Sequence, residues 1–246
     1  MRKSYRELTE EIKTDGERLK LIAALGSSED LAYHYALICE DWAAGGKLLL
    51  ENSFDRHGEA GIVFLLERLR AFGTASKTDE SAAAGTATDT AYLAAKILSQ
   101  LRHRDFYAAR AKELAALLTA RWEISDIALR RKQIIALGWI GSESEINLLI
   151  DSMQSDSDAL CRAWAAAALM QLSFHAVDAA FLRERTKTAF AEAIQKEGDL
   201  NAAGIVIEAA QTLFGKKWIS AAAAEAAESE SIEKARKSAL RFLGKA

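Results

Sequence analysis

The sequence predicts an all-α protein, folded as an α-solenoid of about six stacked helical hairpins. Three observations predict this class. The 246 residues contain no proline, and good helix formers such as Ala dominate the composition. One helix pattern is written twice between Ser125 and Ser173, the second copy 32 residues after the first. A helix with a different pattern separates the copies, as expected where hairpins stack.

The repeated pattern consists of equivalent residues at matching positions of the two copies. The matched pairs are Asp126 and Asp158, Arg130 and Arg162, Ala136 and Ala168, and Leu137 and Leu169. We expect the first copy to form a helix over 126–138 that ends near Gly138 and Gly141, because glycine readily takes the left-handed conformation of a helix end.

The helix between the copies carries an apolar stripe. Ile146, Leu149, Ile150 and Met153 recur at the spacing that places them on one helical face. Ser142 followed by Glu145 predicts a capping box at its start. Neither helix can bury its stripe alone, so packing on neighbouring hairpins must remove this surface from water.

These residues resemble the HEAT-like repeats of the phycobilisome-lyase type, whose second helix reads approximately Asp-x-x-Val-Arg-x-x-Ala-x-x-Ala-Leu-Gly. The match is best over residues 125–173. The first copy reads Asp126, Leu129, Arg130, Gln133, Ala136, Leu137 and Gly138, and the second reads Asp158, Cys161, Arg162, Ala165, Ala168, Leu169 and Met170. Gln133 and Met170 depart from the pattern. The resemblance implies a right-handed superhelix of HEAT-like hairpins, in which Asp and Arg side chains form a ladder and small Ala residues allow close packing.

The rest of the chain is predicted to continue as helices of one domain covering 1–246. Further helices are expected at 4–13, 29–44, 47–54, 59–72, from Asp89 onward, and at 106–122, 177–196, 200–215, 218–227 and 232–243. A degenerate copy of the motif is expected around Arg18 to Gly26. Residues 73–88, rich in Ala, Ser, Thr and Gly, are predicted to form a flexible loop. That loop is interpreted either as a tolerated surface insertion or as a functional loop.

Charge and cysteine content limit the function classes. A net charge of −3 argues against a dedicated nucleic-acid-binding protein, which relies on an excess of Lys and Arg. Cys39 and Cys161 show no paired spacing, so they are expected to be reduced and buried. Glu7, Glu10 and Glu11 stand where a secretory signal would need apolar residues, and no apolar run approaches the ~20 residues of a membrane span. A cytoplasmic location is the expectation.

No motif predicts catalysis. His34, His57, His103 and His175 lack metal-ligand spacing, and we expect each to be structural or at the surface. No phosphate-binding loop or nucleophile elbow occurs. We therefore predict no catalytic residue, no cofactor and no metal, and a protein that is not an enzyme.

A partner-binding surface is predicted from the first copy of the motif. Arg131, Ile135 and Trp139 follow the motif Arg at helical spacing, on the side that faces outward in the resembled family. Trp and Arg are enriched at the centres of protein interfaces. The alternative is that a neighbouring hairpin or the 73–88 loop covers Trp139. Ala163, Ala167 and Gln171, the equivalent residues of the second copy, are small or polar.

A second candidate surface is basic. It comprises Arg102, His103, Arg104, Arg110, Arg121, Arg130, Arg131 and Lys132. Nearby Asp105, Glu113, Glu123 and Asp126 favour an ordinary solvated face, and an acidic partner or phosphate backbone is the alternative.

The predicted function is binding of another protein by a monomeric, non-catalytic scaffold or adaptor, with no membrane contact. Among bacterial repeat proteins of this size, a toxin-neutralising immunity protein is one such role. The alternative is a nucleic-acid-binding HEAT-like protein related to DNA glycosylases. A chromophore lyase is a third reading, for which no bilin pocket is located in the sequence.

Overall fold

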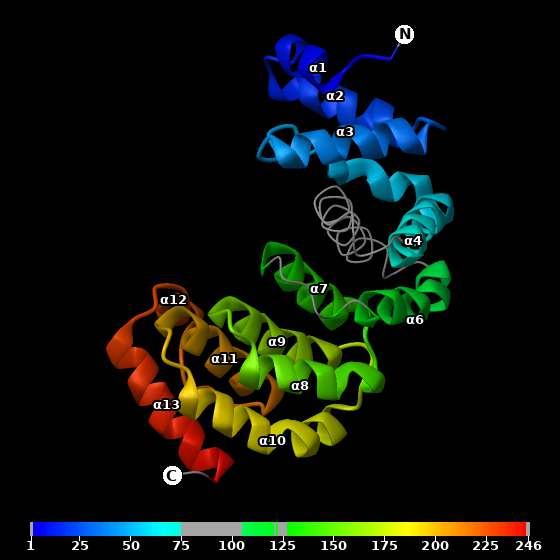
Figure 1. Ribbon diagram of the computed structural model, residues 1–246. Helices are drawn as coiled ribbons and strands as arrows, with labels where there is room; N and C mark the ends of the chain where they lie inside the picture. Colours follow the sequence, from blue (N-terminus) through cyan, green and yellow to red (C-terminus); the bar gives the residue numbers. More distant parts are fainter. Residues whose placement is uncertain (1, 75–104, 121, 123–126, 245–246) are drawn as a thin grey trace. The chain divides into compact units, whose positions relative to one another are not determined.

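The computed structural model describes residues 2–74, 105–120, 122 and 127–244, and these residues form helices, turns and bends without a strand (Figure 1). The predicted all-α class is confirmed. The chain divides into two compact units, Met1–Leu117 and Leu118–Ala246, which we describe separately. The expectation of one continuous domain therefore stays a prediction. None of the described helices is long and apolar enough to cross a membrane.

Unit 1 holds the first helices of the chain. They are α1 (Tyr5–Glu11), α2 (Asp15–Gly26), α3 (Leu31–Ala43), the 3-10 helix η1 (Leu50–His57), α4 (Gly58–Thr74) and most of α6 (Asp105–Thr119). Helices α2, α3 and α4 all pack against η1. Fully buried Leu50 and Phe54 of η1 make this short helix the centre of the described part of unit 1.

Side-chain caps start the first helices as the sequence predicts. The Ser4 and Glu7 side chains form the expected capping box of α1, and Thr14 with Glu17 forms a second one at α2. The helix predicted at 47–54 instead begins at Leu50 and is a 3-10 helix. Buried Asp41 accounts for this shift, since its carboxylate accepts hydrogen bonds from the Leu48 and Leu50 backbone N–H groups and so fixes the chain before η1.

The α4 helix runs through Gly73 to Thr74, past the end predicted at Phe72. Only the first two residues of the loop predicted at 73–88, Gly73 and Thr74, are among the described residues. The helix predicted from Asp89 lies outside them.

Unit 2 is a two-layered stack of helices. Its elements are α7 (Ile127–Ile140), η2 (Glu143–Glu145), α8 (Ile146–Ser155), α9 (Ala159–Leu172), α10 (Ala179–Lys196), α11 (Leu200–Leu213), α12 (Ala221–Glu225) and α13 (Ser229–Leu243). In one layer α7 packs on α9, α9 on α11 and α11 on α12, while in the other α8 packs on α10 and α10 on α13 (Figure 1). Contacts of α8 with α9 and of α10 with α11 join the layers. This is the stacked-hairpin arrangement of an α-solenoid.

Most of the predicted interior of the central hairpins is confirmed. Ile146, Leu149 and Met153 of α8 are buried, Ile150 of the same predicted stripe is only half-buried, and the Ser142–Glu145 capping box is present before them. Four alanines of α9 are also buried, namely Ala163, Ala165, Ala166 and Ala168. Because alanine adds little volume, α9 can pack closely on helices at both of its sides.

Gly138 serves a different purpose from the predicted one. It lies inside α7, which continues to Ile140, and its φ is not positive. A Cβ at this position would lie 2.8 Å from the Ala168 Cα and 3.0 Å from its Cβ. Glycine at 138 therefore allows the α7 backbone to approach α9. Gly204 plays the same part between α11 and the Ala224 backbone of α12.

A buried ion pair joins α9 to the end of α10. The Arg162 Nε and Nη2 atoms donate to the two Glu197 carboxylate oxygens at 2.7 and 2.8 Å, and the Glu197 side chain is only 3% exposed. Burial is the largest single influence and raises the pKa of Glu197, but the hydrogen bonds from Arg162 and from the Asp199 and Gly198 backbone, with the positive charge of Arg162, together outweigh it, so the net shift is downward. Arg236 of α13 also donates to the backbone oxygens of Ile194 and Glu197. Three helices thus meet at the end of α10.

We expect Gly138→Val to destabilise unit 2 by about 2 kcal/mol, because the added atoms must push α7 and α9 apart. Urea unfolding followed by circular dichroism measures this change. Gly198→Val is the matched control, since nothing lies within 4 Å of a Cβ added there. Equal effects of the two substitutions would contradict the assigned role of Gly138.

The Arg162–Glu197 pair is expected to show strong coupling in a double-mutant cycle. Arg162→Met should cost about 3 kcal/mol of unfolding free energy, because it leaves the Glu197 carboxylate buried without its partner. Adding Glu197→Gln should recover a large part of that loss, since the neutral amide can still accept the Asp199 N–H. Urea unfolding of the four proteins at pH 7 gives the coupling. Additive losses would show that the two side chains do not depend on each other.

Candidate functional site

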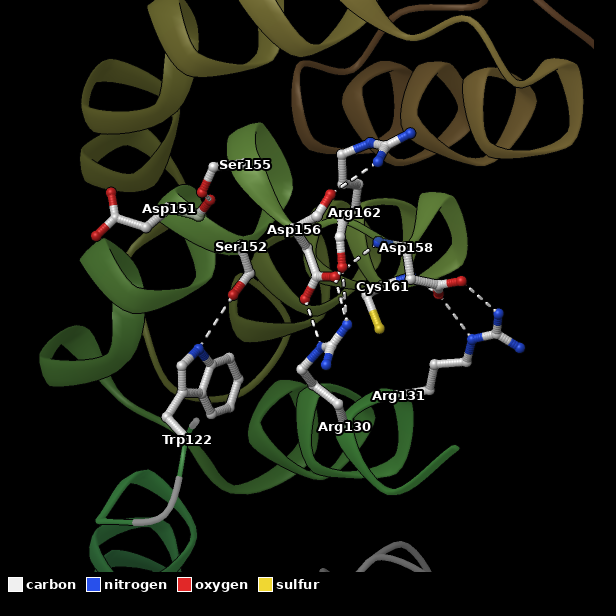
Figure 2. Close-up of polar contacts among 11 residues, drawn as sticks. Trp122, Arg130, Arg131, Asp151, Ser152, Ser155, Asp156, Asp158, Cys161 and Arg162 are labelled. Carbon is white, nitrogen blue, oxygen red and sulfur yellow. Dashed lines mark hydrogen bonds and ion pairs between the residues drawn. The ribbon is translucent and has the colours of Figure 1, made fainter. Parts of the chain in front are cut away.

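Two neighbouring arginines of α7 bind carboxylates in the segment between α8 and α9. Arg130 donates from Nε and Nη2 to Asp156 at 2.8 and 2.9 Å, and Arg131 donates in the same way to Asp158 at 2.8 and 2.6 Å. Figure 2 shows both side chains reaching from α7 toward this segment. Both pairs are bidentate, the geometry in which guanidinium and carboxylate groups bind most strongly.

The ladder implied by the family resemblance is present, with partners that the resemblance did not specify. Arg130 and Arg162, the equivalent arginines of the two copies, each bind a carboxylate that follows the next outer helix, Asp156 after α8 and Glu197 after α10. The motif residue Asp158 instead binds Arg131. Arg162 also donates to the Asp156 backbone oxygen at 2.8 Å (Figure 2), which joins successive ladder pairs.

Asp158 has a second role at the start of α9. Its Oδ1 accepts the Cys161 backbone N–H at 2.8 Å, which makes it the N-cap of the helix. The hydrogen bonds from Arg131 are the main cause that holds the pKa of Asp158 well below its ordinary value, although burial opposes them. Burial raises the pKa of the neighbouring Cys161 thiol to about 12, so this thiol is protonated at neutral pH and is a poor nucleophile.

The three residues predicted to bind a partner lie on α7, and all three are half-buried. Ile135 and Trp139 share one face of the helix. The Arg131 side chain, 35% exposed, turns toward α9 to bind Asp158. Its equivalents, Ala163 on α9 and Gly204 on α11, are buried where neighbouring helices pack. Arg131 therefore borders the exposed face and is held in place by an ion pair.

The exposed face continues over α9 and α11 in the same register. The N-caps Asp158 and Asp199 are equivalent, and positions two, six, nine and thirteen residues after each carry side chains that are half-buried or exposed. These residues are Leu160, Trp164, Ala167 and Gln171 on α9, and Asn201, Ile205, Glu208 and Thr212 on α11. On α7 the equivalent positions are Lys132, Ile135 and Trp139, which follow one another at intervals of one helical turn.

We call the apolar part of this surface the α7–α9–α11 face and define it by Ile135, Trp139, Leu160, Trp164 and Ile205. The sequence reasoning found the first two residues and missed the other three. It placed the outward stripe at one, five and nine residues after the motif Arg, whereas the structure places it at two, five and nine. Counting from the N-cap Asp residues would have found Trp164 and Ile205.

The basic set predicted from the sequence is only partly described. Residues 102–104 and 121 lie outside the described residues, and so does the side chain of Arg110. Arg130 and Arg131 are each bound to an aspartate, which reduces the positive charge that they can offer to a phosphate backbone.

The histidines are less scattered than their sequence positions indicate. In unit 1 the His34 Nδ1 lies 2.9 Å from the His57 Nε2, and His34 is fully buried. The expectation that each is structural or at the surface did not anticipate this contact, because it joins α3 to η1 through the tertiary fold. Within the described ranges, no three His, Cys, Asp or Glu side chains come together in a way that could hold a metal ion.

Comparison with known proteins identifies the repeats of the central region. Residues 81–170 match the sequence model of the family described as HEAT repeats, a span that contains α7, α8 and most of α9 with the Arg130–Asp156 and Arg131–Asp158 pairs. Neither the search of curated proteins nor that of solved structures found a match. The described hairpins of the matched region, α7 to α9, are therefore similar to HEAT repeats.

Proposed function

We propose that this protein is a non-catalytic scaffold or adaptor that binds another protein on the α7–α9–α11 face. The observation that carries this proposal is the gathering of half-buried Ile135, Trp139, Trp164 and Ile205 on successive helices of one layer. HEAT repeats generally mediate protein–protein interaction, which supports the same reading.

The chemistry of the face suits an interface. A tryptophan buries about 150–250 Å² when fully enclosed. If half of that area remains for a partner to cover, each ring can contribute about 2 kcal/mol at roughly 25 cal/mol per Å². The rings lie at different heights on adjacent helices, so they can serve as two separate anchors of the kind on which binding energy concentrates.

The ladder pairs supply the rigidity that this surface needs. Arg131 at its edge is fixed by Asp158, and the start of α9 is fixed by the same carboxylate. A rigid binding surface loses little conformational entropy when a partner docks. In this proposal Arg131 positions α7 beside α9, while Ile135 and Trp139 make the contact.

The partner is a protein whose identity these residues do not specify. A toxin neutralised by an immunity protein and an enzyme complex held by an adaptor both fit the face. We assign no catalytic residue, cofactor or metal to it. Nucleic-acid binding is the less favoured alternative, because Arg130 and Arg131 are already bound to carboxylates.

Trp139→Ala and Trp164→Ala are each expected to weaken partner binding by about 2 kcal/mol, or roughly 30-fold in Kd, because each removes an anchor ring. The partner is first captured from the native host with the wild-type chain. Its affinity for the wild type and both variants is then measured by calorimetry. Urea unfolding should show that neither change costs more than about 1 kcal/mol of stability.

Phe174→Ala is the matched control. This ring is 62% exposed on the turn after α9, outside the face, so its removal should leave the affinity unchanged. Binding that survives both tryptophan substitutions would exclude the face as the interface. A large loss of stability would show instead that the rings belong to the core.

A further inference from the structure

The two histidines of unit 1 form a neutral hydrogen-bonded pair. The His34 Nε2 lies 2.9 Å from the Leu50 backbone oxygen, which can only accept, so the His34 Nε2 carries a hydrogen. The opposite ring nitrogen of neutral His34 is then an acceptor. It follows that the His57 Nε2–H donates to the His34 Nδ1 across 2.9 Å. The Phe54 ring packs against both imidazoles.

This pair helps to hold η1 on α3. His34 and Asp41 are seven residues apart on α3, which places them on the same face. Asp41 accepts the Leu50 N–H and His34 donates to the Leu50 oxygen, so both backbone polar groups of fully buried Leu50 are held by α3. Because η1 lies at the centre of the described part of unit 1, the α3–η1 contact is a junction on which several helices depend.

The junction cannot accept two protons. With both imidazoles charged, all four ring nitrogens carry hydrogens, so no acceptor remains for the bond between His34 and His57. Two positive charges would also lie side by side, one of them fully buried. One proton on the His57 Nδ1 would leave the bond to His34 intact, but it would place a cation beside fully buried His34, and the burial of the half-buried His57 ring opposes it.

The surrounding charges do not compensate for such a cation. Burial lowers the pKa of His34 to about 4, with His57 as the charged neighbour that lowers it further, while the hydrogen bond to Leu50 works in the opposite direction. Burial also lowers the pKa of His57, and Asp55 alone opposes that shift. The elements packed around the pair carry further ionisable groups, which include Tyr5 on α1, Arg18 and Lys20 on α2, Glu40 and Asp41 on α3, Glu51 and Arg56 on η1, and Glu59, Glu67 and Arg68 on α4. Asp41 already binds the Tyr5 hydroxyl, Leu48 and Leu50.

We propose that the His34–His57 pair is an acid-sensitive switch, which keeps η1 docked on α3 at neutral pH and releases it when the histidines take up protons. Both imidazoles bind protons more readily once the junction opens than while it is closed. Lower pH therefore favours the open form, starting near the ordinary titration range of histidine at about pH 6.5.

Unit 2 has no comparable switch among its described residues. Its polar junctions depend on Asp156, Asp158 and Glu197. The pKa values of Asp158 and Glu197 are lowered, so both carboxylates stay charged throughout the range from pH 7.5 to pH 5.5. Between pH 7.5 and pH 5.5, acid should act on unit 1 and leave unit 2 closed.

Hydrogen exchange of the full-length chain, followed by mass spectrometry at pH 7.5, 6.5 and 5.5 and corrected for intrinsic exchange rates, tests this switch. If both histidines titrate only after opening, the opening equilibrium constant for peptides from α3 and η1 should rise by up to about 100-fold over this range. His57→Gln retains an N–H donor for His34 and removes one titrating group. The opening equilibrium constant of this variant should therefore rise by only about tenfold over the same pH range. Peptides from α9 and α11 should not change.

His175→Gln is the control, because it removes an exposed histidine of unit 2 and should reproduce the wild-type profile. Nuclear magnetic resonance of the wild-type imidazole groups provides a second measurement that needs no substitution. Two imidazole signals should stay in the neutral form at pH values where free histidine is charged. Three outcomes would each overturn the proposal. The first is an opening equilibrium constant of α3 and η1 that does not depend on pH, and the second is an equal pH dependence of that constant in the wild type and His57→Gln. The third is titration of all four imidazoles near pH 6.5.

Discussion

The bidentate bond between an inner-layer arginine and the carboxylate after the next outer helix is the constraint that orders unit 2. It occurs as Arg130 with Asp156 and as Arg162 with Glu197. Each bond ties the beginning of one inner helix to the end of the next outer helix, so it fixes both the spacing and the register of successive hairpins. Apolar packing alone is not directional and would leave that register less well defined.

Close packing within the inner layer makes these bonds geometrically possible. Gly138 against Ala168 and Gly204 against Ala224 bring neighbouring helices near to backbone contact. With the flanks of α7, α9 and α11 buried in this way and Ile134, Leu137 and Leu169 in the interior, large side chains such as Trp139, Trp164 and Ile205 are left half-buried at the surface of the layer. The α7–α9–α11 face is thus a consequence of how the layer is packed, and its tryptophans are displayed by the same small residues that bring the helices together.

Local patterns in the sequence were sufficient to predict most of the helices and their starts. Ser4 with Glu7 and Ser142 with Glu145 are caps whose two members are only three residues apart, so no tertiary information is needed to find them. The apolar stripe of α8 was found for the same reason. Gly138 was misread because a glycine that ends a helix and a glycine that admits a neighbouring helix look alike until the neighbour is placed.

Contacts between distant residues account for what the sequence could not reveal about the candidate site. Arg131 reads as an exposed interface residue because nothing local shows that Asp158 binds it. Trp164 was missed because the outward stripe was counted one position away on the second copy. The contact of His34 with His57 joins two elements whose separation in the sequence carries no signal.

The polar junctions inside unit 1 and inside unit 2 differ in how they respond to acid, because unit 2 buries carboxylates and unit 1 buries imidazoles. In unit 2 the buried carboxylates lie beside arginines, whose fixed positive charge favours the ionised acid and makes the junction insensitive to mild acid. In unit 1 the partner of a buried imidazole is another imidazole and a backbone oxygen, neither of which carries a negative charge. A junction built in this way is stable only while it is neutral. Unit 2 therefore contains polar junctions that require charge, whereas the His34–His57 contact of unit 1 excludes it.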